Sequence, residues 1–397
     1  MQKLLLLGDE AIAQGAMDAG LTAIYAYPGT PSTEITEYVM NSDQAQESKI
    51  RSGWSANEKT AMEAALGVSY AGKRAMVCMK HVGLNVAADP FINSSITGAN
   101  GGMIVVAADD PSMHSSQNEQ DSRFFGKFAL MPMLEPVNQQ EAYDMVHYGY
   151  DLSEKYLIPV LIRLTTRLAH SRSGVIRKEP RSQNELKMPS DLRQYVLLPS
   201  IAKKRYLNLL KDQIRFEEES EQSVFNRYFD GSDKSKGIIA CGIGYNYLLE
   251  NYPDRKVPFP VLKIGQYPLP RTLIEKITGE CKEILVLEDG YPVVEEMLKG
   301  YLSLGIRVRG RLDGTIPRDG ELNPNLVAVA LGMPDTKGLP IPELMVGRPP
   351  ALCNGCPHID SYKALNEAIT SMPKGRVFSD IGCYTLGALK PFKAINS

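Results

Sequence analysis

Three cysteines in the last part of the 397-residue chain have a spacing that suits metal or redox chemistry. Cys353 and Cys356 form a C-x-x-C pair, and Cys383 follows further along the chain. Three thiolates suit zinc or an iron–sulfur cluster, although either usually takes a fourth ligand. His358 as that ligand would favour zinc, whereas a cysteine beyond residue 397 would favour an iron–sulfur cluster.

Glu58 is a second candidate, because its carboxylate stands at the start of a predicted helix. The residues Ser55-Ala56-Asn57-Glu58 match a capping box, in which the glutamate accepts a hydrogen bond from the backbone amide of the cap residue. The alternative is a partly buried carboxylate that shares a proton with a bound ligand. The residue spacing alone favours the capping role.

Two further candidates each follow a predicted strand. The run YPGTPSTE at residues 27–34 opens a helix, whose amides and hydroxyls favour an anionic group such as a carboxylate. A Pro-Gly turn with an ordinary Ser or Thr cap would have the same sequence. Lys80 and His81 could contact a substrate, since imidazole exchanges protons near neutral pH. A single histidine, however, more often has a structural role.

A long polar loop at residues 109–123 follows another predicted strand. Long loops in compact domains are often functional. Arg123, at the end of this loop, could bind a carboxylate through two parallel hydrogen bonds, and a surface ion pair is the alternative.

The elements that must position these residues are those of an α/β fold. Short apolar runs alternate with helical patterns, which predicts a mostly parallel sheet covered by helices on both faces. Helices are predicted at residues 8–20, 32–40 and 55–72, with Gly20 and Gly72 as C-terminal stops. Strands are predicted at residues 23–27, 74–79, 102–108 and 159–164. A charged segment follows from about residue 178 to 235, and a second α/β pattern has strand-containing runs at residues 237–250, 259–270 and 283–290.

Composition excludes several classes of protein. The 44 Lys and Arg residues nearly balance 46 Asp and Glu residues, which argues against a nucleic-acid surface and a polybasic membrane patch. The chain has no run of about 18 apolar residues, so a membrane span is not expected. We therefore expect a soluble, cytoplasmic protein with more than one domain.

Six stretches of the chain resemble one family: LLLGDEAIAQGAMDAG, YAYPGTPSTEI, NEKTAMEAALGVSYAGKRAMVCMKHVGLNVAADP, GGMIVVAADDPSMHSSQNEQDSR, LCNGCPH and SDIGCYTLG. The chain resembles the thiamine-diphosphate-dependent 2-oxoacid:ferredoxin oxidoreductases and, among them, the large (alpha) subunits of the indolepyruvate type. The resemblance is close over residues 1–170 and 348–390, and looser over residues 236–335.

The resemblance implies an α/β thiamine-diphosphate-binding fold with several parts. A pyrimidine-binding-type thiamine domain is expected at residues 1–178, and a linker or covering segment at residues 179–235. A transketolase C-terminal-like α/β domain is expected at residues 236–335. The start of a second, diphosphate-binding-type thiamine domain is expected at residues 348–397.

The resemblance also gives roles to the candidate residues. A glutamate at the position of Glu58 bonds N1′ of the aminopyrimidine and promotes the tautomer that deprotonates C2 of the thiazolium ring. Thr30 is implied to contact the keto acid and to lie beside the cofactor. The other residues implied at this site are, for the cofactor, Tyr27 and Pro28 and, for the substrate, Lys80, His81 and Arg123.

An electron path and several partners are implied as well. Cys353, Cys356 and Cys383 match positions that ligate a [4Fe-4S] cluster beside thiamine, although Asn354 stands where the family commonly has proline. The implied reaction is the oxidative decarboxylation of an arylpyruvate to an aryl-acyl-CoA, with electrons passed through iron–sulfur clusters to ferredoxin. A smaller beta subunit, coenzyme A and Mg²⁺ are implied as further components.

One family feature is not found in the sequence. Relatives carry a Gly-Asp-Gly…Asn motif that holds magnesium and the diphosphate, followed by a Cys-rich domain. We therefore expect a fragment, or a subunit completed by another chain, that is inactive alone. The alternative is a non-catalytic or truncated subunit that scaffolds a partner chain.

Overall fold

The computed structural model describes residues 3–189, 195, 197–300, 307–311, 313–317, 320–335, 342–345, 351–372, 377 and 383–394. The chain forms two compact units, residues 1–335 and residues 336–397, and each is described by itself. Within the SDIGCYTLG stretch of the resemblance, residues 379–382 lie outside the described part of the chain.

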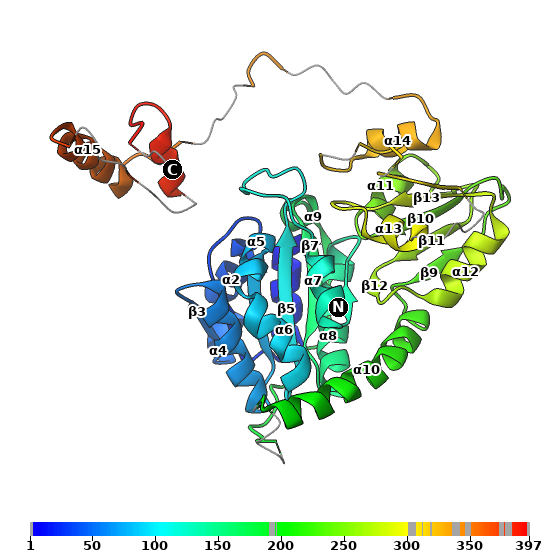
Figure 1. The fold of residues 1–397 in the computed structure, drawn as a ribbon, viewed down its shortest axis with the longest axis horizontal. Coiled ribbons are helices and arrows are strands. Elements are labelled where there is room, and N and C mark those ends of the chain that lie inside the picture. Colours follow the sequence, from blue (N-terminus) through cyan, green and yellow to red (C-terminus); the bar gives the residue numbers. More distant parts are fainter. Residues whose placement is uncertain are drawn as a thin grey trace. The chain divides into compact units, whose positions relative to one another are not determined.

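A seven-stranded sheet forms the first layer of the larger unit (Figure 1). The strands lie in the order β12-β6-β7-β5-β4-β2-β3, and every neighbouring pair is parallel except β12 with β6. The predicted strands are confirmed as β2, β4, β5 and β7. The bounds are β2 (Ala23–Ala26), β3 (Arg51–Trp54), β4 (Ala75–Lys80), β5 (Met103–Asp109), β6 (Met133–Leu134), β7 (Val160–Thr165) and β12 (Gln266–Tyr267).

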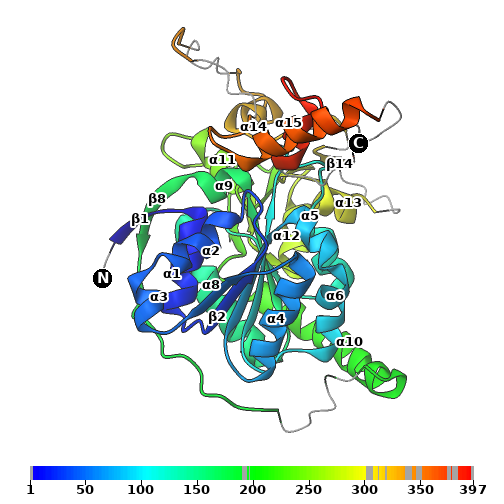
Figure 2. The same ribbon diagram turned by 90° about the vertical axis from the view of Figure 1, so that its left-hand side faces the viewer.

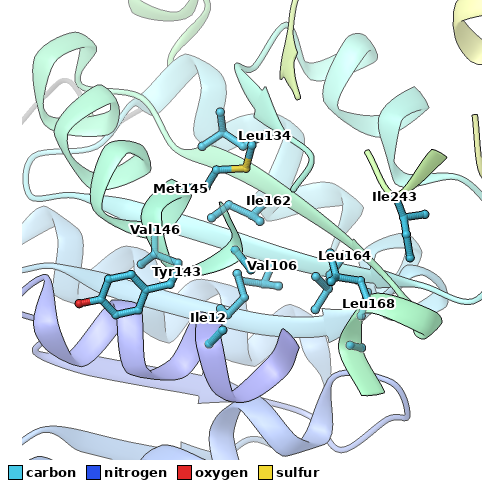
Figure 3. Close-up of a cluster of buried hydrophobic side chains, with 14 of the residues drawn as sticks. Ile12, Val106, Leu134, Tyr143, Met145, Val146, Ile162, Leu164, Leu168 and Ile243 are labelled. Atoms are coloured by element: carbon cyan, nitrogen blue, oxygen red, sulfur yellow. The ribbon is translucent and has the colours of Figure 1, made fainter. Parts of the chain in front are cut away.

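Helices cover both faces of this sheet, with α1 and α8 on one side and α4 and α6 on the other (Figure 2). Successive residues of a strand point to opposite faces. Val106 of β5 accordingly packs in the cluster that contains Ile12 of α1 and Tyr143 of α8 (Figure 3), whereas its neighbour Val105 packs in the cluster that contains Met62 of α4. Burial on both faces explains why these strands are unbroken apolar runs.

The helices of this layer end where the sequence predicts. Gly20 and Gly72 follow α1 and α4 with φ of 78° and 87°, a conformation that favours glycine at the end of a helix. The bounds are α1 (Gly8–Asp18), α2 (Thr33–Met40), α3 (Asp43–Glu47), α4 (Glu58–Tyr70), α5 (His81–Val86), α6 (Ala88–Thr97), α7 (Ser122–Ala129), α8 (Gln139–Tyr156) and α9 (Thr166–His170). A two-stranded antiparallel ribbon joins β1 (Lys3–Leu7) to β8 (Arg172–Ile176).

A five-stranded sheet, in the order β14-β13-β10-β11-β9, forms the second α/β layer of the same unit. Its strands are β9 (Arg227–Phe229), β10 (Gly237–Cys241), β11 (Val261–Ile264), β13 (Glu283–Leu287) and β14 (Arg307–Arg309). Its helices are α11 (Gly244–Glu250), α12 (Arg271–Glu280), α13 (Val293–Lys299) and α14 (Pro324–Leu331). The antiparallel pairing of β12 with β6 links this part of the chain to the first sheet.

The charged segment before the second sheet contains α10 (Pro199–Glu221), whose Leu209 and Phe216 are buried. In the smaller unit, the described elements are α15 (Pro357–Thr370) and the 3-10 helix η2 (Cys383–Ala388). Among the helices of the described residues, none combines the length and the apolar character needed to cross a membrane.

Candidate functional site

The capping role predicted for Glu58 is wrong, because the helix begins later than the sequence suggests. Asn57 is the cap of α4: its Oδ1 accepts a hydrogen bond from the backbone amide of Thr60 at 2.9 Å, and the Asn57 amide donates to Thr60 Oγ1 at 3.3 Å. Glu58 is thus the first helical residue and not the third. Its side chain is buried at the start of α4, with 9% of the residue exposed.

Gly83 of α5 leaves the space that the Glu58 carboxylate occupies. A Cβ at position 83 would lie 2.5 Å from Glu58 Oε1 and 2.7 Å from its Cγ. These distances are far below ordinary van der Waals separation. The missing side chain of Gly83 therefore allows the carboxylate to lie against the backbone of α5.

Lys80, the last residue of β4, connects Glu58 to two neighbouring loops. The stem of Lys80 lies against Gly29, where an added Cβ would be 3.0 Å from Lys80 Cδ. Its Nζ donates a hydrogen bond to the carbonyl of Ser115 at 2.9 Å. Burial lowers the pKa of Lys80, while the carboxylates of Asp110 and Glu58 act in the opposite direction. Lys80 thus places a cation at the polar loop, where the Glu58 carboxylate acts on it electrostatically.

The turn after β2 is held by its own backbone and by the polar loop. The Gly29 amide donates to Thr33 Oγ1 at 2.8 Å, and Ser32 Oγ donates to the Gly29 carbonyl at 2.8 Å. Ser115 Oγ donates to the Thr30 carbonyl at 3.1 Å. The predicted site residues of this turn are exposed: Tyr27, Pro28 and Thr30. Their surfaces are therefore accessible to a ligand.

His81 lies beneath the polar loop. Only 1% of the residue is exposed, and its Nε2–H donates to the carbonyl of Asn118 at 2.8 Å. Its Nδ1 is buried and has no hydrogen-bond partner among the described residues. In this position His81 supports the loop rather than presenting its ring at the loop surface.

Arg123 is fully buried, which does not support its prediction as a carboxylate clamp for a substrate. Its Nη2 lies 2.6 Å from Asp121 Oδ2 and its Nη1 lies 2.9 Å from Glu288 Oε2. Its Nη2 also donates to the carbonyl of Tyr291 at 2.8 Å. All three guanidinium nitrogens are engaged within the protein, since Nε donates to Asp121 Oδ1 at 2.9 Å. Arg123 instead joins the polar loop to the second sheet.

The sequence analysis missed the buried ion network to which Arg123 belongs. Arg163 of β7 is 1% exposed and contacts Asp109 Oδ2 at 2.6 Å, Asp121 Oδ2 at 3.3 Å and the carboxylate of Glu135. Burial opposes the effect, but the guanidinium groups of Arg123 and Arg163 lower the pKa of Asp121 to about 2. The available signal was the arginine inside the otherwise apolar strand at residues 159–164, because a charged residue there needs buried partners.

The candidate residues gather at one edge of the seven-stranded sheet. The turn with Thr30 follows β2, Glu58 follows β3, Lys80 ends β4 and the polar loop follows β5. Because these strands are parallel, their carboxyl ends lie on the same edge, where open α/β sheets commonly bind ligands. The structure thus brings together an acid, a cation and an accessible turn.

The three candidate cysteines lie in the smaller unit, and all are free thiols. Cys353 and Cys383 are exposed, and Cys356 is half-buried at the start of α15. Among the described residues, only Asp9, Glu34 and His170 bring three ligand atoms within 4.8 Å of one another. The three sulfurs are therefore not arranged as compactly as a tetrahedral zinc site requires.

Comparison with known proteins identifies the family. The family model for the thiamine-diphosphate-binding domain of pyruvate flavodoxin/ferredoxin oxidoreductase matches residues 14–199. The indolepyruvate oxidoreductase subunit IorA of Archaeoglobus fulgidus is 41% identical over 100% of this chain and 66% of its own length. That of Pyrococcus abyssi is 41% identical over 100% of this chain and 64% of its own length. The chain belongs to the family of these IorA subunits.

The chain spans about two thirds of the length of these relatives, 66% and 64% in the two cases. A more distant relative, the 2-oxoglutarate synthase subunit KorA of Methanocaldococcus jannaschii, is 27% identical over 44% of this chain and 49% of its own length. The sequence resemblance is therefore confirmed at the level of the family.

Solved structures confirm the predicted fold class. A 2-oxoglutarate:ferredoxin oxidoreductase from Magnetococcus marinus matches with a TM-score of 0.64 and 16% identity, over 78% of this chain and 62% of that one. A split-gene transketolase matches with a TM-score of 0.51 and 14% identity, over 82% of this chain and 97% of that one. The chain thus has a thiamine-diphosphate-binding α/β fold, and its larger unit contains a second α/β sheet.

Proposed function

We propose that this chain supplies the aminopyrimidine half of a thiamine diphosphate site in an arylpyruvate oxidoreductase of the indolepyruvate type. The observation that carries the proposal is the buried Glu58 carboxylate, which lies against Gly83 and is not the capping glutamate of its helix. A carboxylate in this position could hold or accept a proton at a ring nitrogen of a bound cofactor.

The residues present fit this half of the cofactor. Glu58 offers a buried carboxylate, and the missing side chain of Gly83 allows it to occupy this position. When bound, thiamine diphosphate supplies the electron sink for decarboxylation of a 2-oxoacid. We assign no residue of this chain to Mg²⁺ or to the diphosphate, which we propose are held by protein outside the described residues.

The neighbours of Glu58 suit a keto acid. The ammonium of Lys80 would attract the carboxylate of an arylpyruvate, because Lys80 is partly buried and only partly neutralised by nearby acids. We propose that Thr30 contacts the keto acid, and that the exposed Tyr27 and Pro28 line the cofactor side of the turn. His81 has a supporting role in this proposal through its bond to the loop at Asn118.

We further propose that Cys353, Cys356 and Cys383 ligate a [4Fe-4S] cluster through which electrons pass to ferredoxin. Free thiols on one small unit are the donor type that such clusters require. Coenzyme A would accept the acyl group. A smaller beta subunit would complete the enzyme, consistent with the subunit designation of the relatives. We place this enzyme in the cytoplasm.

A substitution at Glu58 tests the proposal. The chain is purified anaerobically with its partner subunit, and arylpyruvate-dependent reduction of ferredoxin is measured. Glu58→Gln keeps the shape of the side chain but removes its charge, and we expect turnover to fall roughly 100-fold or more. Glu63→Gln, at an exposed position of the same helix, is the matched control and should retain activity.

The outcomes separate the proposed enzyme from the scaffolding alternative. Full activity of Glu58→Gln would refute the role of Glu58. Absence of turnover by the wild-type pair, with the two chains still associated, would favour a non-catalytic subunit. Iron analysis of a Cys353→Ser variant tests the cluster separately, since loss of iron is expected whether or not Glu58 is catalytic.

A further inference from the structure

Three potential metal ligands meet on the face of the seven-stranded sheet that α1 and α8 cover, opposite the face that α4 covers. The helices that carry them are distant in sequence. Asp9 lies in the first turn of α1, Glu34 in the first turn of α2, and His170 at the end of α9. One ligand atom from each side chain lies within 4.8 Å of the other two. The Glu58 site uses none of these side chains.

The carboxylates of this cluster lack the donors that buried acids normally have. Asp9 is 0% exposed, and neither of its carboxylate oxygens has a hydrogen-bond partner among the described residues. Glu34 Oε2 is also buried without one. Leaving a buried carboxylate unpaired is costly, so such groups usually face a cation or a donor.

The charged groups that act on Asp9 among the described residues are two carboxylates, those of Glu34 and Glu10. Burial and the facing charge of Glu34 raise the pKa of Asp9 well above its ordinary value. Glu10 adds another negative charge, and its own oxygens serve the Leu7 amide at 2.8 Å and Arg172 at 3.6 Å. His170 Nε2 forms an ion pair with Glu34 Oε1 at 3.6 Å, a distance longer than that of a good hydrogen bond.

We propose that Asp9, Glu34 and His170 bind a divalent transition-metal ion such as Mn²⁺. Two carboxylates and one imidazole are donors that such ions accept, with water in the remaining positions. Entry from solvent is possible because Glu34 lines a surface cavity of about 430 Å³ and His170 lines another of about 270 Å³. The ion would tie the start of α2 to α1 and α9, and so would fix the turn that precedes α2.

Manganese titration of the full chain tests this site without interference from the cysteines, because Mn²⁺ prefers oxygen and imidazole ligands to thiolates. The chain is treated with a chelator, and bound Mn²⁺ is counted by electron paramagnetic resonance. We expect one Mn²⁺ per chain. Asp9→Asn and His170→Ala should each weaken binding at least ~10-fold, since each removes one of three protein ligands. Glu47→Gln, at an exposed position of α3, is the control and should bind as wild type does.

Two results would each overturn the proposal of a metal site. If the wild-type chain binds no stoichiometric Mn²⁺ at about 100 µM, the two carboxylates share a proton and no metal. If His170→Ala and Glu47→Gln bind Mn²⁺ equally well, the ion lies elsewhere. His170 is partly exposed, so His170→Ala should fold even if Asp9→Asn does not. In that case Mn²⁺ binding by His170→Ala tests the site by itself.

Discussion

Gly83→Ala should disable the proposed site by displacing the Glu58 side chain. The new Cβ would lie 2.5 Å from Glu58 Oε1, whereas an unstrained contact is about 3.5 Å, so the oxygen must move by about 1 Å. A displacement of that size breaks a hydrogen bond from a carboxylate to a ligand, and such a charged bond contributes about 1.5–3 kcal/mol. The expected loss of turnover is therefore roughly 10- to 150-fold.

The matched control is Gly67→Ala in α4. A Cβ at Gly67 would meet no atom within 4 Å, so this variant adds a methyl group on the helix that carries Glu58 without touching it. Alanine stabilises a helix interior by about 1 kcal/mol relative to glycine, so Gly67→Ala should not lower the melting temperature, and melting curves of both variants establish that each is folded in the assay. Both are assayed with the partner subunit by arylpyruvate-dependent ferredoxin reduction.

One result would refute this reasoning. If Gly83→Ala turns over as fast as Gly67→Ala, with the same dependence on thiamine diphosphate concentration, the position of the Glu58 carboxylate does not matter for the reaction. The melting curves exclude unfolding as the cause of any loss. An equal loss of turnover in both variants would also contradict the role assigned to Glu58, because a Cβ at Gly67 does not touch its carboxylate.

Three further predictions concern stability. Asn57→Ala should cost about 1 kcal/mol of unfolding free energy in urea titrations, whereas Ser55→Ala should cost nothing measurable, because Asn57 is the cap. Burial raises the pKa of Asp289 from 3.8 to about 6, so the folded chain holds a proton that the unfolded chain releases as the pH rises through this window, and stability falls there. Asp289→Asn should therefore stabilise the protein by about 1–3 kcal/mol at neutral pH and by clearly less near pH 4; an equal gain at both would contradict this. Arg163→Met removes the cationic partner of the buried carboxylates of Asp109 and Glu135, whereas Asp121 keeps Arg123, and should cost about 3–5 kcal/mol, against less than about 1 kcal/mol for Arg181→Met at an exposed ion pair.

The strands and the edge of the sheet that bears the site were predictable because the signals are local. Apolar runs such as residues 102–108 predict strands buried on both faces, and polar residues directly after them must gather at the carboxyl edge. The family followed from long motifs around the same turns. These inferences need no knowledge of how distant segments pack.

The structure does not support the capping role predicted for Glu58 or the ligand-binding role predicted for Arg123. In the first case two capping patterns fit the same residues, and in the second the partner is distant in sequence. Ser55 and Asn57 are both good caps, and each has a suitable residue three positions later. The structure selects Asn57 with Thr60. The partner of Arg123 is Glu288, far along the chain on the second sheet, and no local pattern could reveal that contact.

The buried ion network gives Arg123 a function other than binding a ligand. Asp109 and Asp121 flank the polar loop, and Arg163 contacts both of them, so the two ends of the loop are held together. Arg123 adds the connection to Glu288 at the end of β13. Between these fixed ends, Ser115 bonds both Lys80 and the turn at Thr30. The second sheet therefore holds Arg123 through Glu288, while Asp109 and Asp121 hold the two ends of the loop to Arg163. The loop in turn positions Lys80 through the carbonyl of Ser115.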